Sequence, residues 1–231
     1  HYELKVAKRF FNDNYKKNSI SIRTNNNKKI NVGYFSADFT AHPVIYLLVR
    51  ILELHNTSKF NIYIYSFSKA EDEYTKRCKD AAFCYRAISD LSDREAVEVA
   101  RKDNLDISID LMGYTKNNRM NIFSYRVAPI QINYLGFPCT TGSDQIDYII
   151  GDKVLIPEKY KKFYSEKILY MPNCYMPYDD TRKISNIKYK RIDFNLSNKS
   201  FVLAAFHRNF KITPIEIESW SRLLQKIPNS I

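Results

Sequence analysis

The stretch Leu105-Asp-Ile-Ser-Ile-Asp-Leu-Met-Gly113-Tyr-Thr115 decides the fold. Residues 105–111 predict a strand that ends directly on a glycine-containing loop. Four of the five glycines of the chain lie between Gly113 and Gly151. Because glycine allows sharp turns and close backbone approach, this segment is our candidate for a ligand-facing rim.

Outward from this stretch, short apolar runs alternate with amphipathic segments. Strands are predicted at residues 29–36, 61–67, 129–134, 145–150 and 167–171, and helices at 43–54, 71–83, 93–103 and about 119–125. A proline opens the first of these helices at Pro43, and Ser92 and Glu95 form a capping box at the third. Strands and helices that alternate through short loops are typical of βαβ units, so we expect an α/β fold with a mostly parallel sheet.

The pattern changes after this region. Residues 173–199 are polar and basic with little periodicity, and we interpret them as a linker. A buried strand is then predicted at 200–206, and Thr213-Pro214 opens a helix that runs through Lys226. We expect one complete α/β domain followed by the first βα unit of another.

Composition narrows the class of protein. With 231 residues, 45% hydrophobic and 14% aromatic, the chain can build a real core. No apolar run approaches the 18 residues that suggest a membrane span, and the first residues resemble a charged amphipathic helix more than a secretion signal. The four cysteines show no C-x-x-C spacing, which argues against a zinc site and favours reduced thiols in a cytoplasmic protein.

The net charge of +11 raises the question of nucleic acid as a partner. Residues 1–30 carry 8 Lys/Arg against 2 acids, and residues 159–191 carry 9 against 3. The basic excess therefore lies outside the glycine-rich region, and no known nucleic-acid-binding signature accompanies it. We take nucleic acid as the weaker hypothesis, which a steep salt dependence of DNA or RNA affinity would support.

Three unusual loops follow predicted strands. They begin at Asp38, Gly113 and Leu135. Ligands bind at the carboxyl ends of parallel strands, so we expect the three loops to face one crevice. His42, with a carboxylate four residues earlier, could act as a base. The alternative is that His42 caps the helix and Asp38 is structural.

Two kinds of basic residue could bind phosphate. Lys211 lies just before the helix at Pro214, and a helix N-terminus with a nearby ammonium suits a diphosphate. The alternative is that Lys211 is a solvated lysine in a loop. Arg119 and Arg126 flank a short predicted helix and could bind phosphate or pair with acids such as Asp110. Without G-x-G-x-x-G or a P-loop, a dinucleotide or ATP site of the usual kind is disfavoured.

Several motifs occur together and in order. They are Val32-Gly-Tyr-Phe-Ser-Ala-Asp38-Phe-(x)2-His42-Pro43, Gly113-Tyr-Thr-Lys-(x)2-Arg119, Ala128-Pro-Ile-Gln131-(x)3-Leu135-Gly-Phe-Pro138-(x)2-Thr141-Gly142, Asp147-Tyr-Ile-Ile-x-Asp152, Tyr164-Ser-Glu-Lys167-(x)2-Tyr170-Met-Pro172, and Phe206-(x)4-Lys211-Ile-x-Pro214. Over residues 29–231 the sequence resembles the catalytic region of the O-linked N-acetylglucosamine transferase family, glycosyltransferase family 41, which includes SPINDLY-type O-fucosyltransferases.

The resemblance implies an inverting transferase with two Rossmann-like lobes (the B-type arrangement), UDP-N-acetylglucosamine as donor and protein Ser/Thr as acceptor. It implies no metal and no cofactor. By position, Lys211 would contact the UDP phosphates, and Leu135 and Gly136 would hold the sugar through backbone groups. Asp38, His42 and Lys211 are the implied catalytic residues. The implied substrate-binding residues, besides Lys211, are Pro43, Tyr114, Arg119, Leu135, Gly136, Phe137 and Pro138.

The resemblance also implies an organisation. We expect a basic helical arm at 1–28, the N-terminal catalytic lobe at 29–172, the linker at 173–199 and the start of a nucleotide-binding lobe at 200–231. Tetratricopeptide repeats are expected before His1 and the uridine-binding part after Ile231, so the chain alone should be inactive. A cytoplasmic or nucleocytoplasmic location is expected. An O-fucosyl or other hexosyl donor, and a non-catalytic binding module, remain alternatives.

Overall fold

The computed structural model describes residues 5–9 and 29–231. The chain divides into two units, His1–Arg182 and Lys183–Ile231. Much of the predicted basic arm at 1–28 lies outside the described residues, although residues 5–9 are helical.

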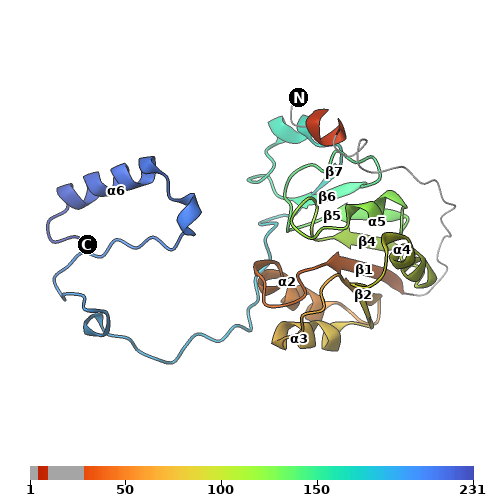
Figure 1. Cartoon of the computed structure of the whole chain (residues 1–231), viewed down its shortest axis with the longest axis horizontal. Coiled ribbons are helices and arrows are strands. Elements are labelled where there is room, and N and C mark those ends of the chain that lie inside the picture. The colour runs from red at the N-terminus through yellow and green to blue at the C-terminus, as the bar shows by residue number, and fades with distance from the viewer. Residues whose placement is uncertain (1–4, 10–28) are drawn as a thin grey trace. The chain divides into compact units, whose positions relative to one another are not determined.

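The first unit is built on one seven-stranded sheet in which every pair of neighbours is parallel (Figure 1). The strands are β1 (Ile30–Ser36), β2 (Phe60–Ser66), β3 (Cys84–Ala87), β4 (Ile107–Asp110), β5 (Ile130–Asn133), β6 (Tyr148–Gly151) and β7 (Lys167–Tyr170). Their order is β3-β2-β1-β4-β5-β6-β7. The chain order thus reverses between β1 and β4, which is the switch point where α/β sheets bind ligands.

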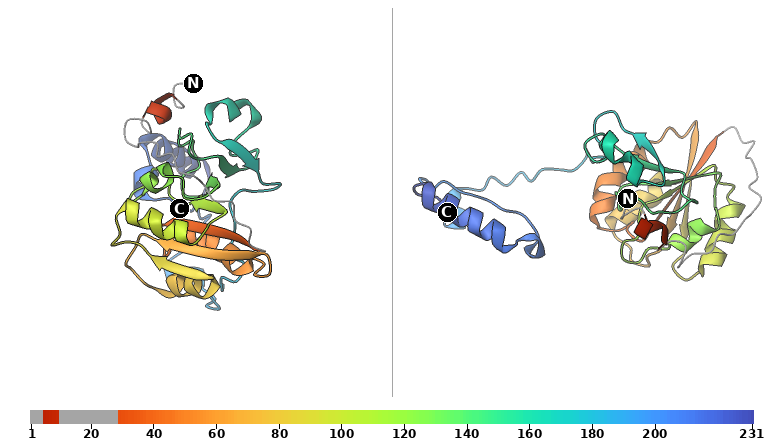
Figure 2. Two further views of the ribbon diagram at one scale, coloured as in Figure 1. Left: turned by 90° about the vertical axis from the view of Figure 1, so that its right-hand side faces the viewer. Right: turned by 90° about the horizontal axis from the view of Figure 1, so that it is seen from above.

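Helices cover both faces of the sheet, as Figures 1 and 2 show. They are α2 (Pro43–Leu54), α3 (Glu73–Ala81), α4 (Asp93–Lys102) and α5 (Met120–Ser124). Alternate residues of β1 explain the two layers: Val32 and Tyr34 pack with α2 and α3, while Phe35 packs with α4 and α5. The predicted fold class, a Rossmann-like α/β sheet, is confirmed.

Local sequence accounts for where the helices begin. Pro43 occupies the first turn of α2, and Asp72 caps α3 by accepting hydrogen bonds from Tyr74 N and Thr75 N, each at 2.9 Å. The predicted capping box of α4 is present: Ser92 N donates to Glu95 Oε2 at 2.8 Å, and Glu95 N donates to Ser92 Oγ at 3.3 Å.

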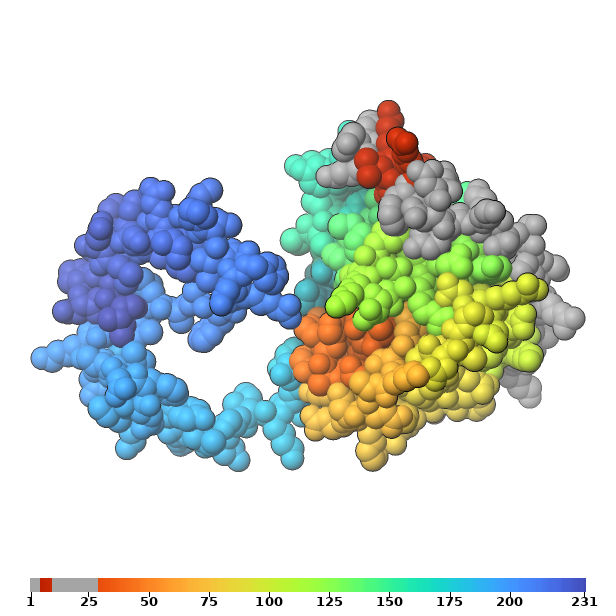
Figure 3. Space-filling view, viewed as in Figure 1, coloured from red at the N-terminus to blue at the C-terminus, as the bar shows by residue number. Residues whose placement is uncertain are grey.

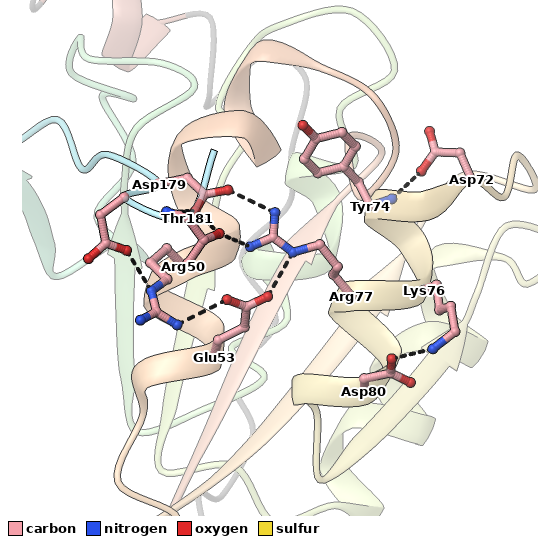
Figure 4. A network of polar contacts seen from close by, with 10 residues as sticks. Arg50, Glu53, Asp72, Tyr74, Lys76, Arg77, Asp80, Asp179 and Thr181 are labelled. Carbon is pink, nitrogen blue, oxygen red and sulfur yellow. Dashed lines mark hydrogen bonds and ion pairs between the residues drawn. The ribbon is translucent and has the colours of Figure 1, made fainter. Parts of the chain in front are cut away.

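The chain leaves the sheet by a strap, residues 175–182, that is fastened to α2 and α3 (Figure 4). Asp179 is fully buried and accepts from Arg77 Nη1 at 2.7 Å and from Thr181 N at 3.0 Å. Arg77 also donates to Glu53 at 2.7 Å. The division between the two units falls after Arg182, within the predicted linker at 173–199, and this ion pair ties residues 175–182 to the sheet domain. The bounds of the linker stay a prediction.

The second unit has no buried residue, although all of Lys183–Ile231 is described. It contains two 3₁₀ turns, Arg191–Phe194 and Asn209–Lys211, and the helix α6 (Pro214–Lys226). The strand predicted at 200–206 is not present. Instead, a single parallel β-bridge joins Phe201 to Ser230, which follows α6 in the chain. Phe206 is 98% exposed, so the apolar run that predicted a buried strand lacks packing partners in this unit. The atoms of this unit are drawn in shades of blue in Figure 3.

Candidate functional site

Three loops share the carboxyl edge of the sheet, because the strands before them are parallel. We call residues 37–42, 111–119 and 134–142 the rim loops; they follow β1, β4 and β5. These three strands are neighbours at the switch point. Side-chain and backbone contacts join the rim loops to one another.

Met112 joins the first two rim loops. Its sulfur accepts a hydrogen bond from Ser36 Oγ at 3.1 Å and from Ala37 N at 3.4 Å. Ser36 Oγ in turn accepts from Asp38 N at 2.9 Å. The position of Asp38 is thus set by a residue of the neighbouring loop.

Gly136 is the point where the loops after β4 and β5 meet the first turn of α2. A Cβ atom built there would lie 2.0 Å from Leu111 O and 3.5 Å from Val44 Cγ2. Val44 is the second residue of α2, two residues after His42. Any side chain at this position would collide with the backbone after β4, so only glycine allows this approach.

Asp110 and Gly113 shape the loop after β4. The buried Asp110 carboxylate accepts hydrogen bonds from Met112 N and Gly113 N, each at 2.9 Å, and Gly113 turns with φ of +52°. A Cβ on Gly113 would overlap the Phe137 side chain. Burial raises the pKa of Asp110 to about 6, while the two backbone hydrogen bonds oppose the rise.

Aromatic side chains close the contact between the loops after β4 and β5. The ring of Tyr114 meets Phe137 edge-on, with centroids 5.5 Å apart. The Tyr114 hydroxyl donates to Thr141 O at 2.6 Å. These two predicted substrate-binding residues are therefore in contact with each other.

The loop after β5 begins with a strained turn. Leu135 has φ of +70°, and Gly136 N donates to Tyr134 O at 2.9 Å, which closes a three-residue turn. A left-handed non-glycine residue costs roughly 1–2 kcal/mol, so the surroundings must hold it. Asn133 does so in part, since its Nδ2 donates to Phe137 O at 2.9 Å and to Cys139 O at 3.2 Å.

His42 and Asp38 carry the chemistry of the loop after β1. His42 Nδ1 lies 3.4 Å from Asp38 Oδ2 and 3.3 Å from Val44 N. Nδ1 cannot donate to the carboxylate and accept from Val44 at the same time. With its proton on Nδ1 held by Asp38, the ring leaves the Nε2 lone pair available as a base; with the proton on Nε2, it caps α2.

The environment suits proton transfer. The His42 side chain is 44% exposed and that of Asp38 is 20% exposed. Burial raises the pKa of the Asp38 carboxyl, and the neighbouring His42 opposes this rise. Both alternatives for His42, base and helix cap, remain compatible with this geometry.

Arg119 has internal partners. Its guanidinium donates to Asp93 Oδ1, Ile88 O and Leu91 O, each at 2.7 Å, and lies over the ring of Phe67. It thereby ties the loops after β2 and β3 to α5. Its contact with a substrate stays a prediction.

Comparison with known proteins identifies the family. The model of the family described as "Glycosyl transferase family 41" matches residues 6–194. The chain belongs to glycosyltransferase family 41.

Two relatives from Arabidopsis thaliana are similar to this family 41 chain over 88% of its length. A "Probable UDP-N-acetylglucosamine--peptide N-acetylglucosaminyltransferase SEC" is 34% identical over 209 residues, and one named SPINDLY is 30% identical over 207. The chain spans about a fifth of these relatives, 21% and 22%. The solved structure of a Thermobaculum terrenum O-GlcNAc transferase mutant matches the fold with a TM-score of 0.84 at 24% identity, covering 98% of this chain and 43% of that one.

Lys211, the implied phosphate contact, lies in the second unit. It is exposed, in the 3₁₀ turn before α6. The N-terminus of α6 already has an anionic cap, because Thr213 N donates to Glu216 Oε2 at 2.9 Å. A hydrogen bond from the Thr213 side chain, with others from backbone N–H groups, lowers the pKa of Glu216. Lys211 is the basic residue inside this turn, and Arg208 comes directly before the turn.

Sequence reasoning gave Asp110 only as a partner for Arg119 or Arg126, which pair instead with Asp93 and Asp147. It missed the role of Asp110, Asn133 and Glu166 in holding the rim loops. Asp110 and Asn133 are paired in register as the last residues of β4 and β5. A polar residue that ends an otherwise apolar strand could have signalled this role. For Glu166, 25 residues from its partner Thr141, the sequence holds no local signal.

A hollow of about 340 Å³ is lined by the first residues of β5, β6 and β7 and by Ser165, whose backbone N–H donates to Thr140 Oγ1 in the loop after β5. Within residues 5–9 and 29–231, no three His, Cys, Asp or Glu side chains gather as a metal site would require. No helix in the same ranges is both long and apolar enough to span a bilayer.

Proposed function

We propose that this chain is part of the catalytic region of a protein O-glycosyltransferase. The enzyme transfers N-acetylglucosamine from UDP-N-acetylglucosamine to Ser or Thr hydroxyls of proteins, with inversion at the anomeric carbon. The observation that carries the proposal is the close approach of Gly136 to Leu111 O after β4 and to Val44, two residues after His42. The names of the SEC and SPINDLY relatives support the choice of donor and acceptor.

The rim loops divide the chemistry between them. Backbone groups of the turn at Leu135 and Gly136 hold the sugar, with the Gly136 N–H already used inside the turn. Asp38 orients His42, and His42 Nε2 takes the proton from the acceptor hydroxyl. The acceptor oxygen attacks the anomeric carbon while the bond to the diphosphate breaks.

Lys211 stabilises the leaving diphosphate. An ammonium placed where charge develops acts most strongly in the transition state, and it needs no metal. Pro43, Tyr114, Phe137 and Pro138 shape the sugar and acceptor site. Acceptor proteins and the nucleotide sugar are the proposed partners, and a cytoplasmic location is the proposed setting.

A donor panel on the full-length protein tests the proposal. UDP-N-acetylglucosamine, other UDP-hexoses and GDP-fucose are each offered with an acceptor protein, and the product is measured by mass spectrometry. A mass increase of one N-acetylhexosamine is expected. Transfer of fucose instead would replace the donor, and no transfer with no UDP binding by calorimetry would favour a non-catalytic module.

Lys211→Ala should lower turnover of the complete enzyme by about 2–3 orders of magnitude. Lys226→Ala is the matched control, since Lys226 is exposed at the other end of α6. Turnover of Lys211→Ala equal to that of the control would refute the phosphate role.

A further inference from the structure

A buried carboxylate outside the rim loops fastens the loop after β5. Glu166 precedes β7 and is 4% exposed. Its Oε1 accepts from Thr141 N at 2.7 Å and from Thr141 Oγ1, and its Oε2 accepts from Thr140 Oγ1 at 2.7 Å and Ser165 Oγ at 3.1 Å. The ion pairs found among the described residues do not include Glu166. Its burial is compensated by these donors, two of them from Thr141.

The neighbours of Glu166 fasten the same stretch. Ser165 N donates to Thr140 Oγ1 at 3.1 Å, and the Tyr164 hydroxyl donates to Pro138 O at 3.2 Å. Residues 164–166 therefore hold residues 138–141 at several points.

Glu166 is connected to the aromatic pair Tyr114 and Phe137 through Thr141. Glu166 accepts a hydrogen bond from Thr141 N, and Thr141 O accepts one from the Tyr114 hydroxyl, whose ring contacts Phe137. A shift of Thr141 would move the partner of Tyr114, which belongs to the loop after β4. Glu166 thus acts on two rim loops without belonging to either.

The strained turn explains why such an anchor is needed. A non-glycine residue at positive φ persists only where both flanks are fixed. β5 holds the side of Leu135 that comes first in the chain, and Asn133 at the end of β5 binds the following residues by donating to Phe137 O and Cys139 O. Glu166 holds the other end of the loop.

We propose that Glu166 is a positioning residue for donor binding: through Thr140 and Thr141 it keeps the loop from Leu135 to Gly142 in the conformation that receives the sugar of the nucleotide sugar. This inference rests on the proposed function, because that function assigns the sugar to this loop. Glu166 itself touches no reacting atom.

The test compares variants of the full-length protein by donor kcat and KM, by UDP-N-acetylglucosamine calorimetry and by thermal unfolding. Glu166→Ala should lower kcat/KM for the donor by about 10- to 100-fold, mainly through KM, because a displaced loop loses its sugar contacts. Glu166→Gln should recover most of this loss, since the amide oxygen still accepts from Thr141 and the hydroxyls can rotate to accept from the amide nitrogen.

The matched control is Asp103→Ala. Asp103 has an 8% exposed side chain that accepts from Tyr65 and Arg86. It lies at the opposite edge of the sheet, where Asn31 near the start of β1 donates to Asp103 O. We expect this variant to lose thermal stability with donor KM unchanged.

Thr141→Val and Thr141→Ser keep the test valid if Glu166→Ala does not fold. Valine removes one donor to Glu166 at nearly constant volume and should raise donor KM severalfold; serine keeps the hydroxyl and should restore it. A folded Glu166→Ala with wild-type donor KM, or losses equal to those of Asp103→Ala at equal stability, would overturn the inference. If the wild type neither binds nor transfers UDP-N-acetylglucosamine, it is the proposed function that fails.

Discussion

The loop after β1 and the loop after β5 are built in opposite ways. The loop after β5 is held by hydrogen bonds from Asn133 Nδ2 and the Tyr114 hydroxyl to its carbonyl oxygens, and by Glu166, which accepts from Thr141 N. In the loop after β1, the ring of His42 is 44% exposed and has two competing partners at 3.3 and 3.4 Å. The comparison separates a loop held by many hydrogen bonds from an exposed ring whose Nδ1 has two competing partners.

His42→Asn should have the largest effect on activity and almost none on stability. Asparagine caps helices well, so the free energy of unfolding should change by less than about 0.5 kcal/mol. Loss of a general base should lower kcat by about 10²- to 10⁴-fold in the complete enzyme. Full activity in this variant would mean that His42 serves only as the cap of α2.

Gly136→Ala should damage both binding and stability. The new Cβ would meet Leu111 O at 2.0 Å, and no side-chain rotation relieves a collision with backbone. We expect a loss of about 2–3 kcal/mol in unfolding free energy and a fall of about 100-fold in donor kcat/KM. Urea titration and steady-state kinetics measure the two quantities.

Gly151→Ala is the control for that variant. Its Cβ would approach Ile156 Cδ1 at 2.8 Å, the end of a flexible side chain that can move. The expected cost is below about 1 kcal/mol. Equal losses in the two variants would show that the contact at Gly136 is not special.

Asp110→Asn should change how stability depends on pH. The pKa of Asp110 is raised to about 6 in the folded protein, so its contribution is fully present below about pH 4 and is lost as pH rises through 6. A rise of roughly two units corresponds to about 3 kcal/mol. Urea unfolding from pH 4 to 8 should show this decline in the wild type and a flatter profile in the variant; identical slopes would contradict the assignment.

Asp179→Asn should have the smallest consequence for the rim loops. Its hydrogen bonds with Arg77 and Thr181 lower the pKa of Asp179 to about 2, against the effect of burial. The folded-state pKa is depressed, so this stabilisation is present above about pH 4 and is lost as pH falls toward 2. At pH 7 we expect a loss of about 2 kcal/mol with donor KM unchanged. A raised donor KM would mean that loss of stability alone disturbs the site.

Much of the fold followed from local patterns. The parallel sheet, the capped start of α4 and the helix after Pro214 were predicted from periodicity and capping residues, and the structure confirms them. β3 was not predicted because the strand has only four residues, Cys84–Ala87, which are half-buried or exposed at the edge of the sheet. The run at 200–206 is apolar enough for a strand, but strand formation depends on partners that local sequence does not specify.

The site was predictable only in outline. Residues at strand ends pointed to three rim loops, because parallel strands end at one edge. Whether Arg119 meets a ligand or carbonyl groups of its own chain depends on contacts with residues 26 to 31 positions away. The hydrogen bonds between Glu166 and Thr141 also join residues 25 positions apart, so local sequence does not predict them.

Hydrogen–deuterium exchange of the full-length protein, with and without saturating UDP-N-acetylglucosamine, tests the central claim most directly. If the three rim loops form one sugar site, peptides that cover residues 37–44, 111–119 and 134–142 should all exchange more slowly with the donor bound. Slower exchange in only one of them, or only at the opposite edge of the sheet, would contradict the account.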